Sequence, residues 1–216
     1  MKKNQPKWHE IKSTAQEGVR FVIANMEAQD LALPSIDSPK GAIEKAKVVF
    51  ILTQSDNKFP ASVVQAHKSG ICAAVLHNDV ISARLALQDL VRVLTPESWC
   101  GVDYEDFRFV AERSASAPLP TVIAGSGTAQ DDNGGLSALE MALVNAGLER
   151  HQDFEKLRGI FVAISGSQHI MKLSVVKAII NEVRARCGGD TNPVMCGTGF
   201  DESIGDSLRV TVLASY

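Results

Sequence analysis

The sequence predicts an α/β fold in three parts: a small parallel layer, a long central helix and a four-stranded, two-layer α/β sandwich. Two continuous apolar runs, 47–53 and 71–76, flank a helical segment at 61–68, as buried parallel strands joined by a right-handed crossover do. Residues 80–94 then form a long amphipathic helix. Beyond it, strand-like and helix-like segments alternate, which is typical of a sheet covered by helices.

The order of these elements divides the chain into three segments. We expect a first domain over residues 1–77, the central helix with an acidic loop over 78–106, and a second domain over 107–216. In the first domain, residues 7–17 are predicted to be helical because Trp8, Ile11 and Ala15 fall on one side. The same domain is predicted to hold a strand at 19–24, a helical turn at 42–46 and a turn at 55–60.

The central helix has the most regular apolar pattern. Val80, Ala83, Leu87, Leu90 and Leu94 recur at alternating spacings of three and four, so they share one face. Asn78 or Asp79 can cap its start, and Pro96 ends it. A helix this apolar usually lies between two layers, so we expect it to be the spine between the two domains. Its plainly polar positions are Arg84, Gln88, Asp89 and Arg92.

The last segment is predicted to form the sandwich. Its expected elements are a helix at 103–112, a strand at 121–129, a helix at 136–145, a strand at 157–165, a helix at 173–187, and strands at 193–200 and 208–214. Both of the later helices are expected to pack on one side of the sheet. Their apolar faces predict burial of Leu139, Leu143, Val176, Ile179, Ile180 and Val183.

Composition excludes several classes of function. The 216 residues are 45% hydrophobic and 22% charged with a net charge of −3, and no basic stripe points to nucleic acid. No apolar run approaches the roughly 20 residues of a membrane-spanning helix, so we expect no membrane insertion. Four scattered cysteines without a CxxC pair indicate buried, reduced thiols in a cytoplasmic protein. The five histidines show no ligand spacing, so no metal site is predicted.

Three stretches carry a family resemblance. The run 197–212 (GTGFDESIGDSLRVTV), the strand 124–129 (AGSGTA), and the central helix with the loop 102–106 (VDYED) resemble the bacterial cell-division protein FtsZ, a tubulin relative. The resemblance implies a truncated Rossmann-like layer followed by an FtsZ-type second domain. It also implies a cytoplasmic, cytoskeletal role in bacterial cell division, with FtsZ or further copies of this chain as end-to-end partners.

The family's two phosphate-binding loops lack clear counterparts. FtsZ binds GTP through two glycine-rich loops, and the strand and loop that hold the first are not found in this sequence. At the place of the second stands 55–60 (SDNKFP), without glycine. A phosphate cradle needs converging backbone N–H groups, but Pro60 supplies none and Asp56 repels anions. We therefore expect no cofactor and degenerate GTP binding.

Five residues match functional positions of the family. Asp103 and Asp106 match acids that polarise the attacking water at the nucleotide of the neighbouring subunit. Their alternative is a helix capping box, and Gly101 replaces the family's usual Asn. Asn25, Glu27 and Asp79 match nucleotide-contacting positions. The alternatives are a turn-forming Asn and, for Asp79, a helix cap.

Three functions remain open from the sequence. The chain can be a one-sided cap that docks its acidic-loop end on FtsZ and stops elongation, or a polymer that assembles without nucleotide. The alternative is a divergent FtsZ-family GTPase that binds GTP with magnesium at residues outside the usual loops. A nucleotide titration separates the enzyme from the other two.

Overall fold

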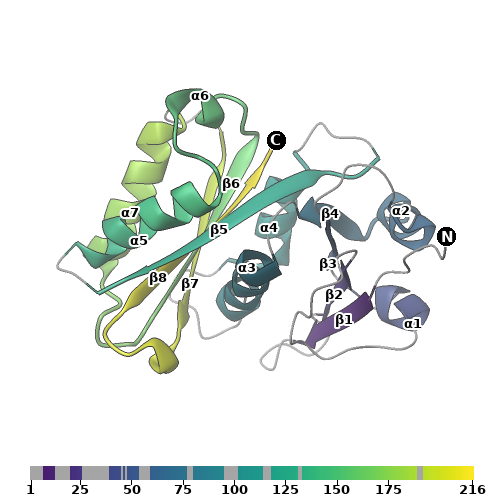
Figure 1. Ribbon diagram of the computed structural model, residues 1–216, viewed down its shortest axis with the longest axis horizontal. Coiled ribbons are helices and arrows are strands. Elements are labelled where there is room, and N and C mark those ends of the chain that lie inside the picture. Colours follow the sequence, from purple (N-terminus) through teal and green to yellow (C-terminus); the bar gives the residue numbers. More distant parts are fainter. Residues whose placement is uncertain are drawn as a thin grey trace.

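The fold is given by a computed structural model of the chain (Figure 1). The structure describes residues 7–12, 20–25, 39–44, 46, 48–53, 59–76, 80–94, 102–113, 118–130, 133–188 and 192–216.

Eight strands join into one sheet of order β1-β2-β3-β4-β5-β8-β6-β7. Its first four strands are β1 (Lys7–Lys12), β2 (Arg20–Asn25), β3 (Val48–Leu52) and β4 (Cys72–Leu76). The other four are β5 (Thr121–Ala129), β6 (Gly159–Gly166), β7 (Val194–Phe200) and β8 (Leu208–Ser215).

The N-terminal layer has the predicted parallel core. Strands β2, β3 and β4 are parallel neighbours, and α2 (Ala61–Lys68) connects β3 to β4. With α1 (Pro39–Glu44), α2 covers one face of this layer, over a cluster that includes Val49, Val63 and Val75. The predicted helix at the start of the chain is wrong, because residues 7–12 form β1, antiparallel to β2. Six residue pairs along β2 outweigh a local helical pattern, since so short a helix is marginal without packing.

The two halves of the sheet meet at a narrow junction. Strand β4 is parallel to β5 over only two residue pairs, Val75 with Thr121 and Leu76 with Val122. One further hydrogen bond, 2.8 Å long, runs from the Val75 N–H to the Pro120 carbonyl. Beyond this junction, β5 turns to β8 and pairs with it antiparallel along its length (Figure 1). The domain boundary itself remains a prediction.

The C-terminal sheet has β8 at its centre, antiparallel to both β5 and β6, with β7 parallel to β6. One face carries α5 (Gly134–Asn145) and α7 (Leu173–Arg186), and the short α6 (His151–Phe154) lies nearby. Of the six predicted core residues on α5 and α7, five are buried and Ile180 is partly buried. The two helices therefore face the sheet in the predicted register.

Glycines bring α5 unusually close to β5. A Cβ added at Gly125 would lie 2.1 Å from the Ala142 carbonyl oxygen, and one at Gly127 would lie 2.2 Å from that of Ala138. Only glycine permits this approach, which explains the glycines of this strand without a ligand.

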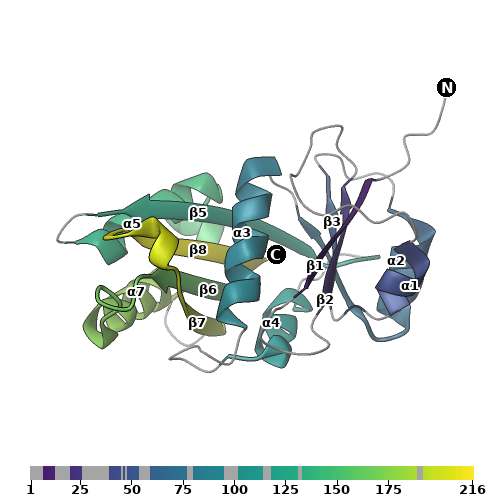
Figure 2. The ribbon, with the colours of Figure 1, turned by 90° about the horizontal axis from the view of Figure 1, so that it is seen from below.

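The central helix α3 (Val80–Val93) lies where the sequence places it, between the two halves (Figure 2). Together with α4 (Tyr104–Ala111) it covers the second face of the C-terminal sheet, so a third layer adds to the two expected. Leu87 and Leu90 are buried in a cluster that takes residues from both halves, including Phe50 of β3 and Phe161 of β6. The caps expected at Asn78 and Asp79 lie outside the described residues.

Candidate functional site

The two candidate catalytic acids lie at the start of α4 and form a complete capping box. The Asp103 carboxylate accepts hydrogen bonds from the backbone N–H of Glu105 at 2.8 Å and of Asp106 at 3.1 Å. In return, the Asp106 carboxylate accepts from the Asp103 N–H at 3.0 Å. The structural alternative from the sequence is therefore realised. It leaves both groups at the surface in fixed orientations, Asp103 exposed and Asp106 partly exposed.

Aromatic packing anchors this acidic helix start to the rest of the molecule. Phe107 is fully buried, with its ring centroid 5.8 Å from that of Phe50 and 5.7 Å from that of Phe161. The second of these contacts is edge-to-face, a preferred aromatic geometry. Because Phe50 belongs to β3 and Phe161 to β6, α4 is tied to both halves of the sheet. A residue on this helix therefore has a well-defined position relative to each half.

The surroundings of the capping box are mostly acidic. Glu105 is exposed beside it, and its carboxylate lies 3.8 Å from the Arg108 guanidinium, which makes a closer pair with Glu112 at 3.0 Å. The hydrogen bond with Glu112 raises the pKa of Arg108. This arginine thus makes its closer ion pair at the C-terminal end of α4, away from the capping box. The helix N-terminus supplies only partial positive charge, so the acidic character of this surface persists.

The candidate nucleotide residues of the N-terminal layer are only partly described. Asn25 is the last residue of β2, in register with Leu52 at the end of β3. The ends of parallel strands are where α/β sheets bind ligands. Glu27 and Asp79 lie outside the described residues, as does most of the 55–60 turn. Pro60 precedes α2, and its carbonyl accepts from the N–H of Val63 and Val64. Having no N–H of its own, it cannot help to hold a phosphate.

A closed ring of four charged side chains, Asp89, Arg92, Asp201 and Arg209, joins α3 to the C-terminal sheet. Asp89 lies 2.7 Å from both Arg92 and Arg209, and Asp201 lies 3.0 Å and 2.8 Å from the same two guanidinium groups. The Thr211 hydroxyl donates a further bond to Asp89 at 2.6 Å. The ring balances two negative against two positive charges. It holds α3 across the strands and offers no net charge to a ligand.

The sequence did not reveal this ring. Asp89 is one of the polar positions in the pattern of the central helix, yet it is only 1% exposed and lies on the packed side. The available signal was the one acid in the described span of the central helix, together with an arginine within the otherwise apolar strand β8. Burial opposes the charge of Arg209, but its bonds and proximity to Asp89 and Asp201 raise its pKa, so it stays protonated.

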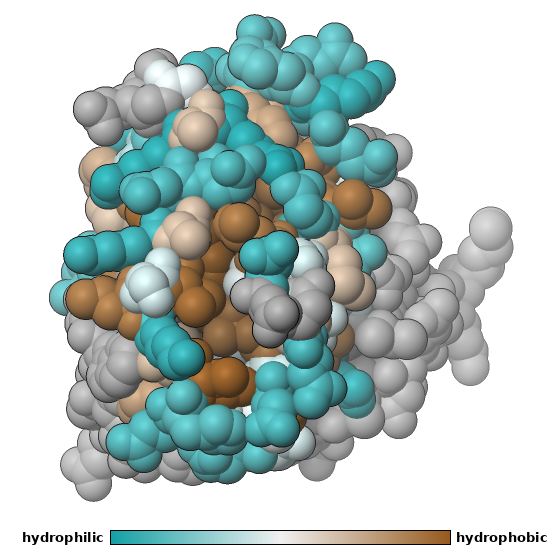
Figure 3. Space-filling model, turned by 90° about the vertical axis from the view of Figure 1, so that its left-hand side faces the viewer, coloured by the Kyte–Doolittle hydropathy of each residue, from teal (hydrophilic) through white to brown (hydrophobic). Residues whose placement is uncertain are grey.

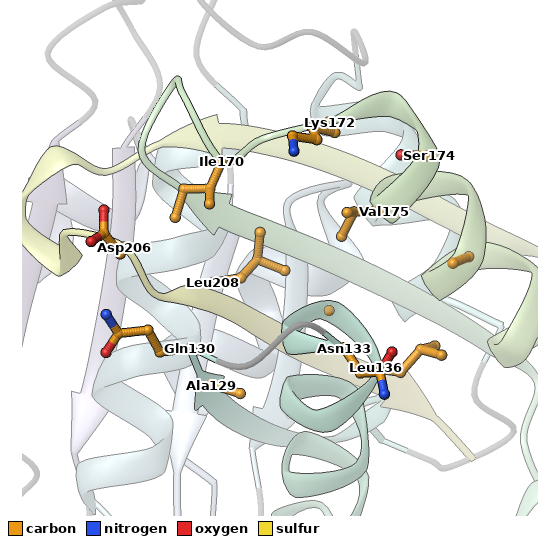
Figure 4. A pocket seen from close by; sticks show the side chains of 12 residues that line it. Ala129, Gln130, Asn133, Leu136, Ile170, Lys172, Ser174, Val175, Asp206 and Leu208 are labelled. Atoms are coloured by element: carbon orange, nitrogen blue, oxygen red, sulfur yellow. The ribbon is translucent and has the colours of Figure 1, made fainter.

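A cavity of about 400 Å³ opens at the far end of the C-terminal sheet. Figure 4 shows its lining side chains, which come from the end of β5, the start of β8 and the turn before it, the starts of α5 and α7, and the loop before α7. The apolar part of the lining includes Leu136, Ile170, Val175 and Leu208, and Lys172 and Asp206 carry its charges. The space-filling view of this end shows an apolar centre rimmed by hydrophilic residues (Figure 3). Leu173, next to the cavity, is 56% exposed.

Other kinds of site find little support in the described part of the chain. It contains no cluster of three metal-ligating side chains, and no helix there is long and apolar enough to cross a membrane. Burial raises the pKa of the Cys72 thiol to about 12, and burial also raises that of Cys187 to about 11. Both thiols are therefore protonated at neutral pH and unsuited to act as nucleophiles.

Comparison with known proteins points to one family. The model of the FtsZ family, C-terminal domain, matches residues 121–215. The cell division protein FtsZ of Wigglesworthia glossinidia brevipalpis is 31% identical over 138 residues, which cover 64% of this chain and 33% of that protein. FtsZ of Buchnera aphidicola subsp. Baizongia pistaciae is 28% identical over 180 residues, or 83% of this chain and 44% of that protein. The chain thus spans less than half the length of these relatives.

Solved structures show the same fold. An empty FtsZ dimer from M. jannaschii matches with a TM-score of 0.54 at 17% identity, covering 82% of this chain and 49% of that one. CetZ from Methanosaeta thermophila matches with a TM-score of 0.50 at 14% identity, covering 82% of this chain and 54% of that one. At these identities the likeness concerns the fold alone.

Proposed function

The chain is an FtsZ-like protein, and from that premise we propose that it acts on FtsZ-type polymers as a one-sided cap, with little or no GTP binding of its own. The observation that carries the proposal is the contrast between its two ends. The acids of the α4 capping box are present, oriented and anchored by Phe107. At the β3–α2 connection, where the family has a phosphate loop, Pro60 stands before the helix.

The proposed contact brings the acidic start of α4 to the nucleotide-bearing end of an FtsZ subunit. Asp103 and Asp106 then face the bound nucleotide and magnesium of that subunit, in the role that matching acids have in the family. The capping bonds hold the two carboxylates in place before contact, so little ordering is needed on binding. In this proposal the chain offers no normal nucleotide end in return, so the next subunit cannot add and elongation stops.

Two acids alone cannot hold such a complex. Stable protein contacts bury about 800 Å² on each partner, so a wider face around α4 must take part. We therefore expect the acids to affect hydrolysis at the junction more than the affinity of the complex.

The test adds this protein, below equimolar amounts, to its cognate FtsZ with GTP and follows polymer mass, filament length and phosphate release. Shorter or fewer filaments support the cap. The variant Asp103→Asn with Asp106→Asn keeps good capping groups but removes both charges, and should change phosphate release while complex formation persists. A matched control, Glu149→Gln with Glu155→Gln, removes the same charge from two exposed acids away from α4 and should behave as the parent.

Two results overturn the cap. Unchanged polymer mass and length at equimolar ratio, with no detectable complex, rejects it and leaves nucleotide-independent self-assembly, which sedimentation of this chain alone then tests. Micromolar binding of GTP with magnesium in calorimetry favours the divergent GTPase instead.

A further inference from the structure

Two loops at the far end of the C-terminal sheet are joined through one histidine. His169 lies in the loop between β6 and α7, and its Nε2 is 2.8 Å from the Asp206 carboxylate in the turn before β8. Its Nδ1 is 3.0 Å from the Ser167 hydroxyl. That hydroxyl also reaches the other loop, since it donates to the Gly205 carbonyl at 2.9 Å.

The direction of each hydrogen bond follows from what each partner can do. A carbonyl oxygen only accepts, so the single hydroxyl hydrogen of Ser167 is committed to Gly205. Towards His169, the Ser167 oxygen is then left only as an acceptor, and Nδ1 must donate. An ionised carboxylate also only accepts, so Nε2 must donate to Asp206. Both ring nitrogens carry a hydrogen at once only in the imidazolium form.

We propose that His169 is a proton-dependent latch that holds the β6–α7 loop to the β7–β8 turn in its charged form and loosens them when it loses its proton. A neutral imidazole has one hydrogen and cannot make both bonds as described. Either Nε2 turns a lone pair towards the Asp206 carboxylate, or the Ser167 hydroxyl swings from Gly205 to Nδ1. In each case one of the bonds between the two loops is lost.

The charged groups around the ring favour the latched form. Asp206 faces it from the turn, and Glu202 stands on the same segment, where its carboxylate accepts from the Gln168 N–H at 2.9 Å. Lys172 is the cation on the loop itself, and it lines the cavity together with Asp206. The two nearby acids belong to the segment that the latch must hold. Their attraction to the imidazolium therefore acts in the direction of closing.

The same three residues do not form a hydrolytic triad. Ser167 is 1% exposed and its hydrogen is held by Gly205, so no substrate can reach its oxygen and the histidine cannot take its proton. His169 and Asp206 are instead about two-thirds exposed, at 65% and 68%. This is the reverse of a triad, in which the serine is open and the acid is buried.

The latch controls one side of the cavity. Ile170 and Asp206 both line it, one from each of the two joined loops (Figure 4). Protonation closes the latch because the cationic form of His169 makes one more bond between the two loops than the neutral form does. The latch is therefore closed when the imidazole is charged and open when it is neutral.

The experiment measures the full chain alone and so does not depend on the proposed function. Imidazole ¹⁵N shifts report whether both nitrogens of His169 carry hydrogen, from about pH 5 to 8. Hydrogen exchange of the Gln168, Ile170 and Met171 amides, corrected for the intrinsic rate, reports how firmly the loop is held. Ile170 and Met171 are suitable probes because their N–H groups bond to the Ser167 carbonyl.

We expect both ring nitrogens of His169 to carry hydrogen at the acid end. The protection of these amides should fall by roughly twofold to fivefold as His169 loses its proton, which is the change expected from losing one exposed ion pair. His169→Gln and Asp206→Asn should each abolish this pH dependence. His151→Gln is the matched control, since His151 also faces a carboxylate, Glu155 at 3.5 Å, but on α6. The same pH dependence in His169→Gln as in the parent overturns the latch, and so does a parent in which His169 deprotonates without any change at these amides.

Discussion

Two pairs of aspartates differ in what holds their carboxylates, and they serve different purposes. Asp103 and Asp106 lie at the surface and accept hydrogen bonds from backbone N–H groups of α4. Asp89 and Asp201 are buried and share two guanidinium groups in a closed ring. In the first pair the negative charge stays available, because N–H groups carry only partial charge. In the second pair it is neutralised by Arg92 and Arg209, which leaves a structural clamp.

The comparison shows which acids can serve a ligand. A carboxylate held by neutral donors keeps its charge and gains a fixed direction. In a carboxylate held by arginines, the charge is neutralised and the oxygens already accept bonds from the guanidinium groups. The predictions below test this difference, because the ring should matter for folding and the α4 pair mainly for the proposed contact.

Asp89→Asn should be the most damaging change. It removes one negative charge from a site that is 1% exposed, so Arg209 loses its ion pair with Asp89 and keeps the one with Asp201. Breaking a buried ion pair typically costs about 3–5 kcal/mol. Urea unfolding should show a loss of this size. Asp103→Asn, the same substitution in the exposed pair, should change the free energy of unfolding by less than about 0.5 kcal/mol, because Asn and Asp cap equally well.

A double variant tells whether the loss comes from the ring. Asp89→Asn with Arg209→Met removes the arginine that has lost its bond to Asp89 together with that partner. It should therefore cost less than the sum of the two single changes. Strict additivity would mean that the two groups do not interact, and the ring would lose its role as a clamp.

Leu90→Ala tests the apolar half of the same attachment. Leu90 is fully buried one position after Asp89, in the cluster shared by both halves of the sheet. Truncating a buried leucine usually costs about 2–5 kcal/mol, a large part of the ~5–15 kcal/mol of a typical domain. The melting temperature should fall by several degrees. A variant that melts like the parent would contradict the role of α3 as the spine between the halves.

Local patterns were enough to predict most elements. The helix 61–68 and the strand 121–129 have the bounds found in the structure, because apolar runs there end at clear breaks such as Pro60 and Gly70. The capping box was likewise predictable, since it depends on two acids three residues apart. These features are set by interactions between near neighbours in the chain.

Pairing between distant parts of the chain is what the sequence could not predict. Residues 7–12 carry a spacing that suits a helix, but β2 offers them a strand partner that the sequence alone does not reveal. Asp89 pairs with Arg209 from 120 residues away, and the residues around Asp89 do not identify that partner. Asn25 is placed at a strand end, whereas Glu27 and Asp79 lie outside the described residues, and a nucleotide role for all three stays a prediction.

Asp103→Ala should have a moderate effect. It removes the acceptor for the N–H groups of Glu105 and Asp106, and losing such a cap typically costs about 0.5–2 kcal/mol. Asp103→Asn restores the acceptor and should recover that stability in the same urea experiment. If the alanine and asparagine variants are equally stable, the capping bonds contribute nothing, and the case for pre-oriented acids weakens with them.

The smallest expected effect is on the stability of the fold at low pH. Burial opposes ionisation of Asp201, but hydrogen bonds from Ser203 and the charges of Arg92 and Arg209 outweigh it and lower the pKa of its carboxyl. A carboxyl with a lowered folded-state pKa stabilises the fold above its unfolded value, about 3.9, and this contribution is lost as pH falls through the folded value. The ring should thus resist acid until below about pH 4.

Ser203→Ala removes one cause of that lowering, since both the hydroxyl and the N–H of Ser203 bond to Asp201 and only the N–H remains. The pKa of Asp201 should rise towards its ordinary value, so the acid-unfolding midpoint should move to higher pH while stability at neutral pH changes little. Ser69→Ala is the control, because the Ser69 hydroxyl donates to the Gln65 carbonyl at the end of α2 and does not contact Asp201. Equal midpoints for the two variants would show that protonation of Asp201 does not set the acid-unfolding midpoint.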